Sequence, residues 1–301
     1  MSFAGEAKAE ICRSKIERKC CAVAESYGVL LYCNTFSPNE IRISTANPGF
    51  SDRLPRLFRK AFGTEFDILP PEGAERKRTF IIRNEEKLDR IFGTFDISRE
   101  GLVVQHLNYA VIENDCCRMA FIKGAFLAGG SVTDPEKRYH LEMTSSHRSA
   151  LRETIPVLQD MGFSPKESSR AGNGLLYFKQ ADAISDFLTM AGAPVTSMKV
   201  LTAKVEKEMR NTITRQINCD SANADKTVTA AQEQISAIKR FVGEYGLDAL
   251  PEPLRDAALL RITNPEASLS DLASLSMPKV SKSCLSHRLR KIMSMAPEEK
   301  V

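Results

Sequence analysis

Long hydrophobic runs are missing from this sequence. No window of the 301 residues approaches the ~20 apolar residues that a membrane-spanning helix needs. The amino-terminal stretch from Met1 to Lys19 is charged and contains no apolar run of the secretory type. A chain of this length can build two domains with a real hydrophobic core. We therefore expect a soluble cytoplasmic protein that has no membrane partner.

Metal-ligand spacing is missing as well. The eight cysteines include no C-x-x-C pair, and the four histidines add no ligand-like spacing. Structural zinc sites usually pair their ligands roughly two to four residues apart. Reduced cysteine behaves as a small hydrophobic residue, so we predict that the cysteines pack in the core and that the protein holds no metal and no cofactor. They are Cys12, Cys20, Cys21, Cys33, Cys116, Cys117, Cys219 and Cys284.

A short pattern, C-C-x-x-A-x-x-x-G, occurs twice in the chain. It covers Cys20–Gly28 and Cys116–Gly124, with an offset of 96 residues. Within each copy, the alanine and the glycine are spaced at i and i+4, on one face of a helix, which allows two helix backbones to approach closely. We predict that the two helices pack on each other across a pseudo-twofold axis, with the two sheets forming one saddle. The alternative is that these are small core residues in unrelated helices.

The same order of predicted elements accompanies both copies of the pattern. Two-residue alternation predicts strands, 3.6-residue stripes predict helices, and glycines mark helix ends. In the first repeat the predicted strands and helices are Glu40–Ser44, Ser51–Phe62, Glu65–Leu69, Arg78–Ile82 and Asn84–Phe92. In the second repeat they are Arg138–Met143, Ser146–Met161, Phe163–Ser168, Leu175–Lys179 and Ala181–Met190. Each repeat is therefore predicted to be αββαββα.

The end of the second opening helix resembles a known signature. Residues Phe121–Val132, FIKGAFLAGGSV, resemble the helix-ending motif of LAGLIDADG homing endonucleases, whose fold has this repeat and topology. The resemblance implies one acid per repeat, just before the last glycine of the motif, which binds the divalent metal that activates water. Gly129 and Cys33 occupy those positions here, and neither is an oxygen ligand for a hard cation. We therefore predict no catalytic residue; the alternative is a residual metal-dependent endonuclease that uses Glu25 or Asp134.

The carboxy-terminal part is predicted to be all helical. A polar, weakly amphipathic segment over 194–226 is expected to be a helical linker, followed by a helix at Thr229–Gly243. Helices at Leu254–Ile262 and Leu269–Leu275 precede a last helix that ends near Met295. A short middle helix, a turn and a basic final helix are typical of a helix-turn-helix domain.

Side-chain patterns support these short helices. Ser268 with Asp271 three residues later is typical of a capping box, and Ser281 or Ser283 is expected to cap the last helix. The predicted buried faces consist of leucine and isoleucine at helical spacing. They are Leu269, Leu272 and Leu275 on the middle helix, and Leu285, Leu289 and Ile292 on the last helix.

Negative charge is missing from the start of the last helix. The whole chain carries only +4, which permits a nucleic-acid partner without requiring one. Between Lys279 and Lys291, however, five Lys or Arg residues occur with no acid. Basic groups attract phosphates, and short polar groups and Arg read base edges; the alternative is an ordinary solvated helix. The predicted DNA-binding residues are Ser268, Lys279, Lys282, Ser283, Ser286, His287, Arg288, Arg290 and Lys291.

The chain as a whole resembles the WhiA family of bacterial regulators. The most specific stretches are Asn218–Val228, Gly246–Pro251 and Lys282–Lys291. The resemblance implies a nucleoid-associated DNA-binding regulator, linked to cell division and chromosome segregation. It further implies transcription control alongside a sigma factor in sporulating relatives, and an endonuclease domain that no longer cleaves DNA.

The predicted architecture is α+β, with a duplicated αββαββα LAGLIDADG-like saddle followed by an all-α helix-turn-helix domain. The predicted domains are 1–193, with repeats at about 1–95 and 110–193, then the linker 194–226 and the DNA-binding domain 227–301. The expected partner is duplex DNA, with RNA polymerase or a sigma factor as further partners of the first domain, and no small-molecule substrate. Basic residues of the first repeat are expected to add phosphate contacts. They are Arg53, Arg56, Arg59, Lys60, Arg76, Lys77 and Arg78.

Overall fold

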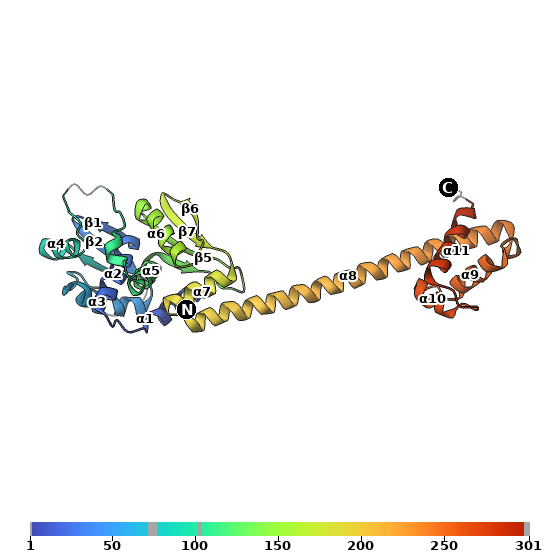
Figure 1. The fold of residues 1–301 in the computed structure, drawn as a ribbon, viewed down its shortest axis with the longest axis horizontal. Coiled ribbons are helices and arrows are strands. Elements are labelled where there is room, and N and C mark those ends of the chain that lie inside the picture. Colours follow the sequence, from blue (N-terminus) through green and yellow to red (C-terminus); the bar gives the residue numbers. More distant parts are fainter. Residues whose placement is uncertain (1, 72–76, 101–103, 298–301) are drawn as a thin grey trace. The chain divides into compact units, whose positions relative to one another are not determined.

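The chain divides into two units, Met1–Lys207 and Glu208–Val301. The computed structural model describes residues 2–71, 77–100 and 104–297 of them. The first unit mixes helices with two sheets and the second is helical (Figure 1), as the α+β assignment predicts. Within the described ranges, every helix is too short or too polar to cross a membrane.

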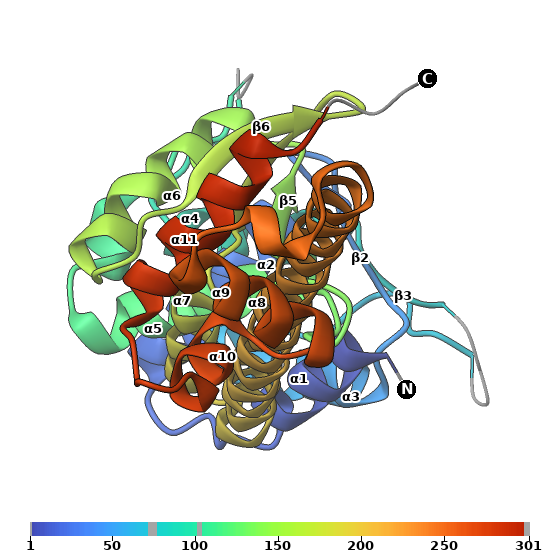
Figure 2. The same cartoon turned by 90° about the vertical axis from the view of Figure 1, so that its right-hand side faces the viewer.

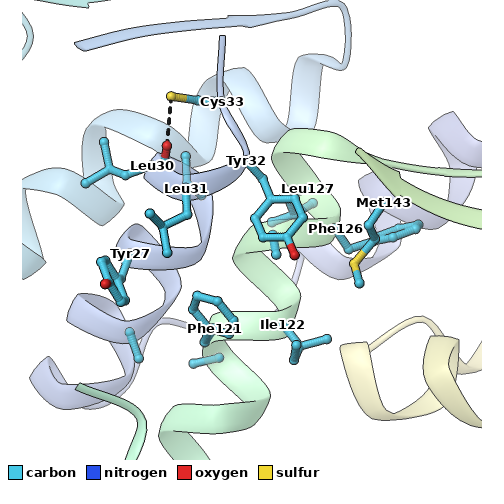
Figure 3. Close-up of a cluster of buried hydrophobic side chains, with 14 of the residues drawn as sticks. Tyr27, Leu30, Leu31, Tyr32, Cys33, Phe121, Ile122, Phe126, Leu127 and Met143 are labelled. Carbon is cyan, nitrogen blue, oxygen red and sulfur yellow. Dashed lines mark hydrogen bonds between the residues drawn. The ribbon is translucent and has the colours of Figure 1, made fainter. Parts of the chain in front are cut away.

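Two helices, α2 (Lys19–Tyr32) and α5 (Asp115–Gly129), form the centre of the first unit. They run side by side in the same direction, and apolar side chains of both are buried around them (Figure 3). A Cβ atom on Gly28 would lie 2.0 Å from the Phe121 carbonyl oxygen, and one on Gly124 would lie 2.0 Å from the Glu25 carbonyl oxygen.

These two close approaches are equivalent under the 96-residue offset, because Glu25 corresponds to Phe121 and Gly28 to Gly124. The predicted pseudo-twofold packing of the two helices is therefore confirmed. Only a residue without a side chain allows backbones this close, which explains why both copies of the pattern end in glycine.

The sheet of the first repeat is smaller than predicted. It contains β1 (Thr35–Ser37), β2 (Glu40–Thr45) and β3 (Arg78–Ile82) in antiparallel order β1-β2-β3. Helices α3 (Pro48–Phe62) and α4 (Glu85–Thr94) complete the repeat. The helix α1 (Phe3–Cys12) precedes α2, and the short helix η1 (Tyr109–Ile112) precedes α5.

The predicted strand at Glu65–Leu69 is wrong, since only an isolated bridge joins Ile68 to Ile81. Ile68 and Leu69 are 45% and 57% exposed, so little apolar burial drives further pairing. The Asp67 carboxylate instead accepts hydrogen bonds from the backbone N–H groups of Arg83 and Asn84. This side-chain interaction replaces the ladder that a strand would have formed.

The second repeat has all the elements that were predicted for it. Its sheet has the order β4-β5-β7-β6. Boundaries differ from the predicted ones by a few residues, as at β5, which covers Leu141–Ser145 where Arg138–Met143 was predicted. The elements are β4 (Gly130–Val132), β5, α6 (Arg148–Asp160), β6 (Lys166–Arg170), β7 (Asn173–Phe178) and α7 (Ala181–Ala191).

A single helix, α8 (Pro194–Tyr245), occupies the segment where a linker and a separate helix were predicted. The helical character predicted for 194–226 and for Thr229–Gly243 is confirmed, but the two segments are one helix and not two. No proline or glycine occurs between residues 195 and 242, so nothing in the backbone stops a helix there. The helix ends at Gly246, whose φ of +80° lies outside the helical region.

Three short helices follow α8 in the second unit. They are α9 (Glu252–Thr263), α10 (Leu269–Leu275) and α11 (Lys282–Met295), preceded by the single turn η2 (Leu247–Ala249). Leu272, Leu285, Leu289 and Ile292 are buried in one core, as predicted. Leu275 is 55% exposed, so its predicted place on the buried face is wrong. The helix α10 ends at that residue, while Leu272 and Ala273 of the same turn are buried.

Candidate nucleic-acid interface

Two serine caps fix where the helices of the second unit begin. Ser268 accepts a hydrogen bond from the Asp271 N–H (3.2 Å), and the Asp271 carboxylate accepts one from the Ser268 N–H (3.2 Å). This capping box confirms the predicted start of α10. Ser281 caps α11 by accepting from the Cys284 N–H at 3.2 Å. The segment 276–281 is therefore the turn between a short helix and the last helix, as in a helix-turn-helix unit.

The last helix has one buried and one exposed face. Leu285, Leu289 and Ile292 lie on the buried face. Ser283, His287 and Arg290 are exposed and follow one another at i, i+4 and i+7, so they form a single stripe on the opposite face. Figure 2 shows α10 and α11 toward the viewer. A narrow polar stripe on a helix that follows a capped turn is a suitable surface to enter the DNA major groove.

The predicted DNA-binding residues differ in exposure. Six of them are exposed: Lys279, Lys282, Ser283, His287, Arg290 and Lys291. Ser268, Ser286 and Arg288 are half-buried. The Ser268 hydroxyl already donates to the Asp271 carboxylate at 2.7 Å, so its role in the structure is to cap α10. The role of all nine residues in DNA binding remains a prediction.

The cations of this surface carry unneutralised charge. Across the residues that the structure describes, Lys279, Lys282, Arg288, Arg290 and Lys291 form no ion pair with a carboxylate. Charges that are not already paired are free to replace the counterions of a phosphate backbone. The electrostatics of α11 therefore favour a polyanion.

A buried arginine that was not predicted from the sequence connects the helices behind this surface. Arg261 is 1% exposed, and its Nε donates to Gln234 Oε1 at 2.9 Å. Its Nη1 donates to the Ala267 carbonyl at 2.7 Å, just before the cap of α10. Arg261 thus ties α8 and α9 to the start of the helix-turn-helix. The sequence offered no signal for it, because an arginine on a short mixed helix is typical of a surface position.

The degenerate motif positions lie together at the other candidate site. Cys33 follows the last residue of α2, and Gly129 is the last residue of α5. Both border a pocket of about 300 Å³ whose other lining side chains include Tyr32, Asn34 and Thr144 but no carboxylate. The Cys33 thiol donates to the Leu30 carbonyl at 3.2 Å (Figure 3), and burial raises its pKa to about 12.

The backbone also leaves no room for an acid at this end of α5. A Cβ atom on Gly129 would lie 2.3 Å from the Thr144 carbonyl oxygen. An aspartate at that position would therefore force α5 and β5 apart. The two motif positions supply no oxygen ligand for a hard divalent cation, and the position of Gly129 has no room for a side chain that would supply one.

The two acids of the alternative nuclease hypothesis do not meet at a common site. Glu25 is buried, with 3% of its surface exposed, and its carboxylate accepts two hydrogen bonds from Arg53, at 2.5 and 2.8 Å. Asp134 is exposed in a turn, where it accepts from the Glu136 N–H at 3.0 Å. Both oxygens of Glu25 are buried and engaged by Arg53, whose positive charge opposes the approach of a metal ion, so the structure speaks against Glu25 in that role.

Not all of the basic residues predicted to contact phosphates on the first repeat can do so. Arg53 is 1% exposed, so its predicted phosphate contact is wrong; its charge neutralises Glu25 instead. Arg59 pairs with Glu65, and Lys60 donates to the carbonyl groups of Ile16 and Glu17.

Two of the remaining basic residues are exposed, as a phosphate contact requires. Arg56 and Lys77 are exposed, and Arg78 is half-buried. Arg76 lies outside the described residues. The positive surface of the first repeat is therefore smaller than the sequence suggested.

The cysteines do not all pack in the core as predicted. Cys12, Cys33 and Cys117 are buried, but Cys20 and Cys219 are exposed. The remaining three are half-buried: Cys21, Cys116 and Cys284. The expectation of uniform core packing is therefore wrong, because several of these cysteines lie at helix ends and on the polar part of α8.

Comparison with known proteins gives matches along the whole chain. Family models match residues 118–210, as the WhiA LAGLIDADG-like domain, and residues 213–296, as the WhiA C-terminal HTH domain. The "Probable cell division protein WhiA" of Ruminiclostridium cellulolyticum is 33% identical over 98% of this chain and 97% of its own. The protein of the same name from Macrococcus caseolyticus is 34% identical over 98% and 96%.

Solved structures share the fold. The crystal structure of full-length DUF199/WhiA from Thermatoga maritima matches with a TM-score of 0.60 and 24% identity, over 98% of each chain. The N-terminal LAGLIDADG domain of DUF199/WhiA matches with a TM-score of 0.50 and 21% identity, over 64% of this chain and 92% of its own.

Proposed function

The chain belongs to the WhiA family, and from that premise we propose that it is a DNA-binding regulator of transcription connected with cell division. The observation that carries this proposal is the exposed stripe of Ser283, His287 and Arg290 on α11, in a segment, 279–291, that contains five Lys or Arg residues and no acid. The curated relatives are named as cell division proteins, which supports the biological setting. We extend the proposal to chromosome segregation and to a place at the nucleoid in the cytoplasm.

The proposed DNA contacts divide by chemistry. Lys279, Lys282 and Lys291 hold phosphates, which gives affinity without sequence preference. Ser283, His287 and Arg290 face the base edges, and Arg290 is suited to guanine through its forked donors. The half-buried Arg288 lies at the side of the stripe, where a phosphate contact suits it better than a base contact.

Alanine substitution of the stripe tests the proposal. Arg290→Ala in the full chain should weaken binding to a natural promoter by about 1–3 kcal/mol and relax preference at one base position. Lys239→Ala is the matched control, because it removes an exposed cation of α8 in the same unit but outside the stripe. Equal binding of the Arg290→Ala variant and the unmodified chain would overturn the role of α11.

We also propose that the first unit does not cleave DNA. The carboxylate-free pocket at Cys33 and Gly129 and the paired state of Glu25 support this. Supercoiled plasmid with Mg²⁺ or Mn²⁺ should stay intact at high protein concentration. Nicking that disappears in an Asp134→Asn or Glu25→Gln variant would establish the residual nuclease instead.

The intact fold of the first unit supports a second role, as a contact surface for the transcription machinery. A two-repeat scaffold has been kept although its motif positions lack metal ligands. We propose that it binds RNA polymerase or a sigma factor while α11 holds the promoter. Purified polymerase, with and without sigma factor, should be retained by the immobilised full chain in the absence of DNA. Retention only through added DNA would contradict this role.

A further inference from the structure

Four cysteines gather where the two central helices begin. Cys20 and Cys21 lie in the first turn of α2, and Cys116 and Cys117 lie in the first turn of α5. All four Sγ atoms lie within 4.8 Å of one another. The sulfur atoms are 4.0 Å apart in the first adjacent pair and 3.9 Å apart in the second.

The symmetry of the fold brings these residues together. The helices run parallel and in register at an offset of 96, so Cys20 corresponds to Cys116 and Cys21 to Cys117. The backbone contacts at Gly28 and Gly124 hold both helix starts close to the pseudo-twofold axis. Each repeat therefore contributes two sulfur atoms. The cluster lies roughly 18 Å along the helices from Cys33 and Gly129, at 1.5 Å per residue, so it is separate from the degenerate motif.

The spacing of the sulfur atoms suits one tetrahedral metal ion. Zinc–sulfur bonds of about 2.3 Å place four thiolates about 3.8 Å apart. The adjacent pairs, with sulfur atoms 4.0 and 3.9 Å apart, already meet this spacing. The sulfur–sulfur distances between the two pairs are at most 4.8 Å, and a small rotation of the side chains would shorten them to the same value. An iron–sulfur cluster distributes its thiolates over several iron atoms and needs them farther apart than this.

Helix starts and basic side chains lie beside the cluster. The cluster belongs to the first turns of two helices, and neither Arg18 nor Asn114 caps its helix with a side-chain hydrogen bond. Helix starts stabilise negative charge. A zinc ion with four thiolates keeps a net charge of about −2. The adjacent pocket of about 320 Å³ is lined by Cys21 and Cys116, by the cations Lys15, Arg18 and Lys123, and by the acids Glu17 and Glu25, of which Glu25 is already paired with Arg53.

We propose that Cys20, Cys21, Cys116 and Cys117 bind one structural Zn²⁺ ion that joins the two repeats. Soft thiolate ligands select zinc over the magnesium or manganese used by nucleases, so the site serves the fold and not hydrolysis. The exposed side chain of Cys20 gives the ion a route of entry. At these solvent-facing helix ends little side-chain surface is buried, so the zinc ion would supply the stabilising contact between the two repeats.

The metal content of the full chain tests this site. The protein purified with reductant and without chelator should carry about one zinc per chain by mass spectrometry of the metals, released when a thiol reagent is added. After exchange with Co²⁺ alone, thiolate-to-cobalt charge-transfer bands and the intense visible bands of tetrahedral cobalt should appear. This spectrum is recorded on the unmodified chain, so it does not depend on whether a variant folds.

A matched pair of variants assigns the ligands. Cys116→Ser should lose the zinc and the cobalt spectrum, and Cys219→Ser, which removes an exposed cysteine of α8 outside the cluster, should keep both. The proposal is overturned if the reduced chain takes up no zinc, if Cys116→Ser retains it, or if the cobalt spectrum is that of an octahedral ion. Peptide mapping that finds disulfides between the two cysteine pairs, in a chain that binds no metal when reduced, would also overturn it.

Discussion

At the scale of single residues, two buried arginines have roles that their sequence positions hide. Arg53 holds Glu25 through a bidentate pair and also donates to the Ser14 carbonyl at 2.5 Å, which joins α3 to α2 and to the segment after α1. Arg261 does the same for α8, α9 and the start of α10. Buried guanidinium groups are stable only when their donors are satisfied, so each fixes several segments at once.

The Glu25–Arg53 pair should be far more sensitive to mutation than a surface pair. Glu25→Ala leaves a buried, unpaired guanidinium, and we expect a loss of about 3–5 kcal/mol in the unfolding free energy of the first unit. Glu65→Ala is the control: the Arg59–Glu65 pair is 66% and 69% exposed, so its loss should cost about 0–1 kcal/mol. Urea unfolding measures both. Similar losses would show that the buried pair adds no more than the exposed one.

At the scale of secondary-structure elements, the contact between α2 and α5 organises the first unit. The two glycines let the backbones touch, the cysteine pairs lie at one end of the helices, and the degenerate motif lies at the other end. The same contact explains why neither helix has a marked polar face: each is surrounded by core, and Figure 3 shows side chains such as Leu31, Phe121 and Phe126 buried around them.

Adding one methyl group at this contact should separate the helices. Gly28→Ala places a Cβ atom 2.0 Å from the Phe121 carbonyl oxygen, and overpacking of this kind costs about 1–3 kcal/mol or more. Gly93→Ala is the control, because nothing lies within 4 Å of its Cβ position in α4, and alanine should stabilise that helix by about 0.5–1 kcal/mol. Thermal unfolding should move in opposite directions for the two variants. A stabilised Gly28→Ala variant would contradict the close packing.

At the scale of the whole molecule, the two units contribute different chemistry to one chain. The second unit carries the stripe of Ser283, His287 and Arg290 on α11 with the cations around it. The first unit carries a few exposed cations, Arg56 and Lys77 among them. We propose the domains 1–193 and 227–301 with the helical segment 194–226 between them. Tethering a weak DNA contact to a stronger one raises apparent affinity through effective concentration.

The salt dependence of DNA binding should show whether the first unit contributes. Each phosphate contact adds about 0.9 to the slope of log affinity against log salt concentration on duplex DNA. Arg56→Ala with Lys77→Ala should therefore lower the slope of the full chain by up to about 2, whereas Lys239→Ala should leave it unchanged. An unchanged slope in the double variant would mean that these cations do not touch DNA, which would favour the role of the first unit as a protein-contact surface.

The sequence by itself determined those features that depend on short-range patterns. The capping box at Ser268, the buried face of α11, the duplicated helices and the missing motif acids at Cys33 and Gly129 could all be predicted, because helix caps, 3.6-residue periodicity and small-residue spacing act within a few turns. The continuity of α8 could also have been predicted from its lack of proline and glycine, but its polarity suggested a linker.

Only the tertiary structure decided which distant residues meet. Burial of Arg53 and Arg261, the single bridge in place of a strand at Glu65–Leu69, and the gathering of four cysteines all depend on contacts between segments far apart in the chain. Adjacent cysteines do not have the spacing of a zinc motif, and two such pairs form a tetrahedral set only because α2 and α5 pack in register about a shared axis. Local periodicity fixes which face of a helix is buried, but not which neighbour covers it.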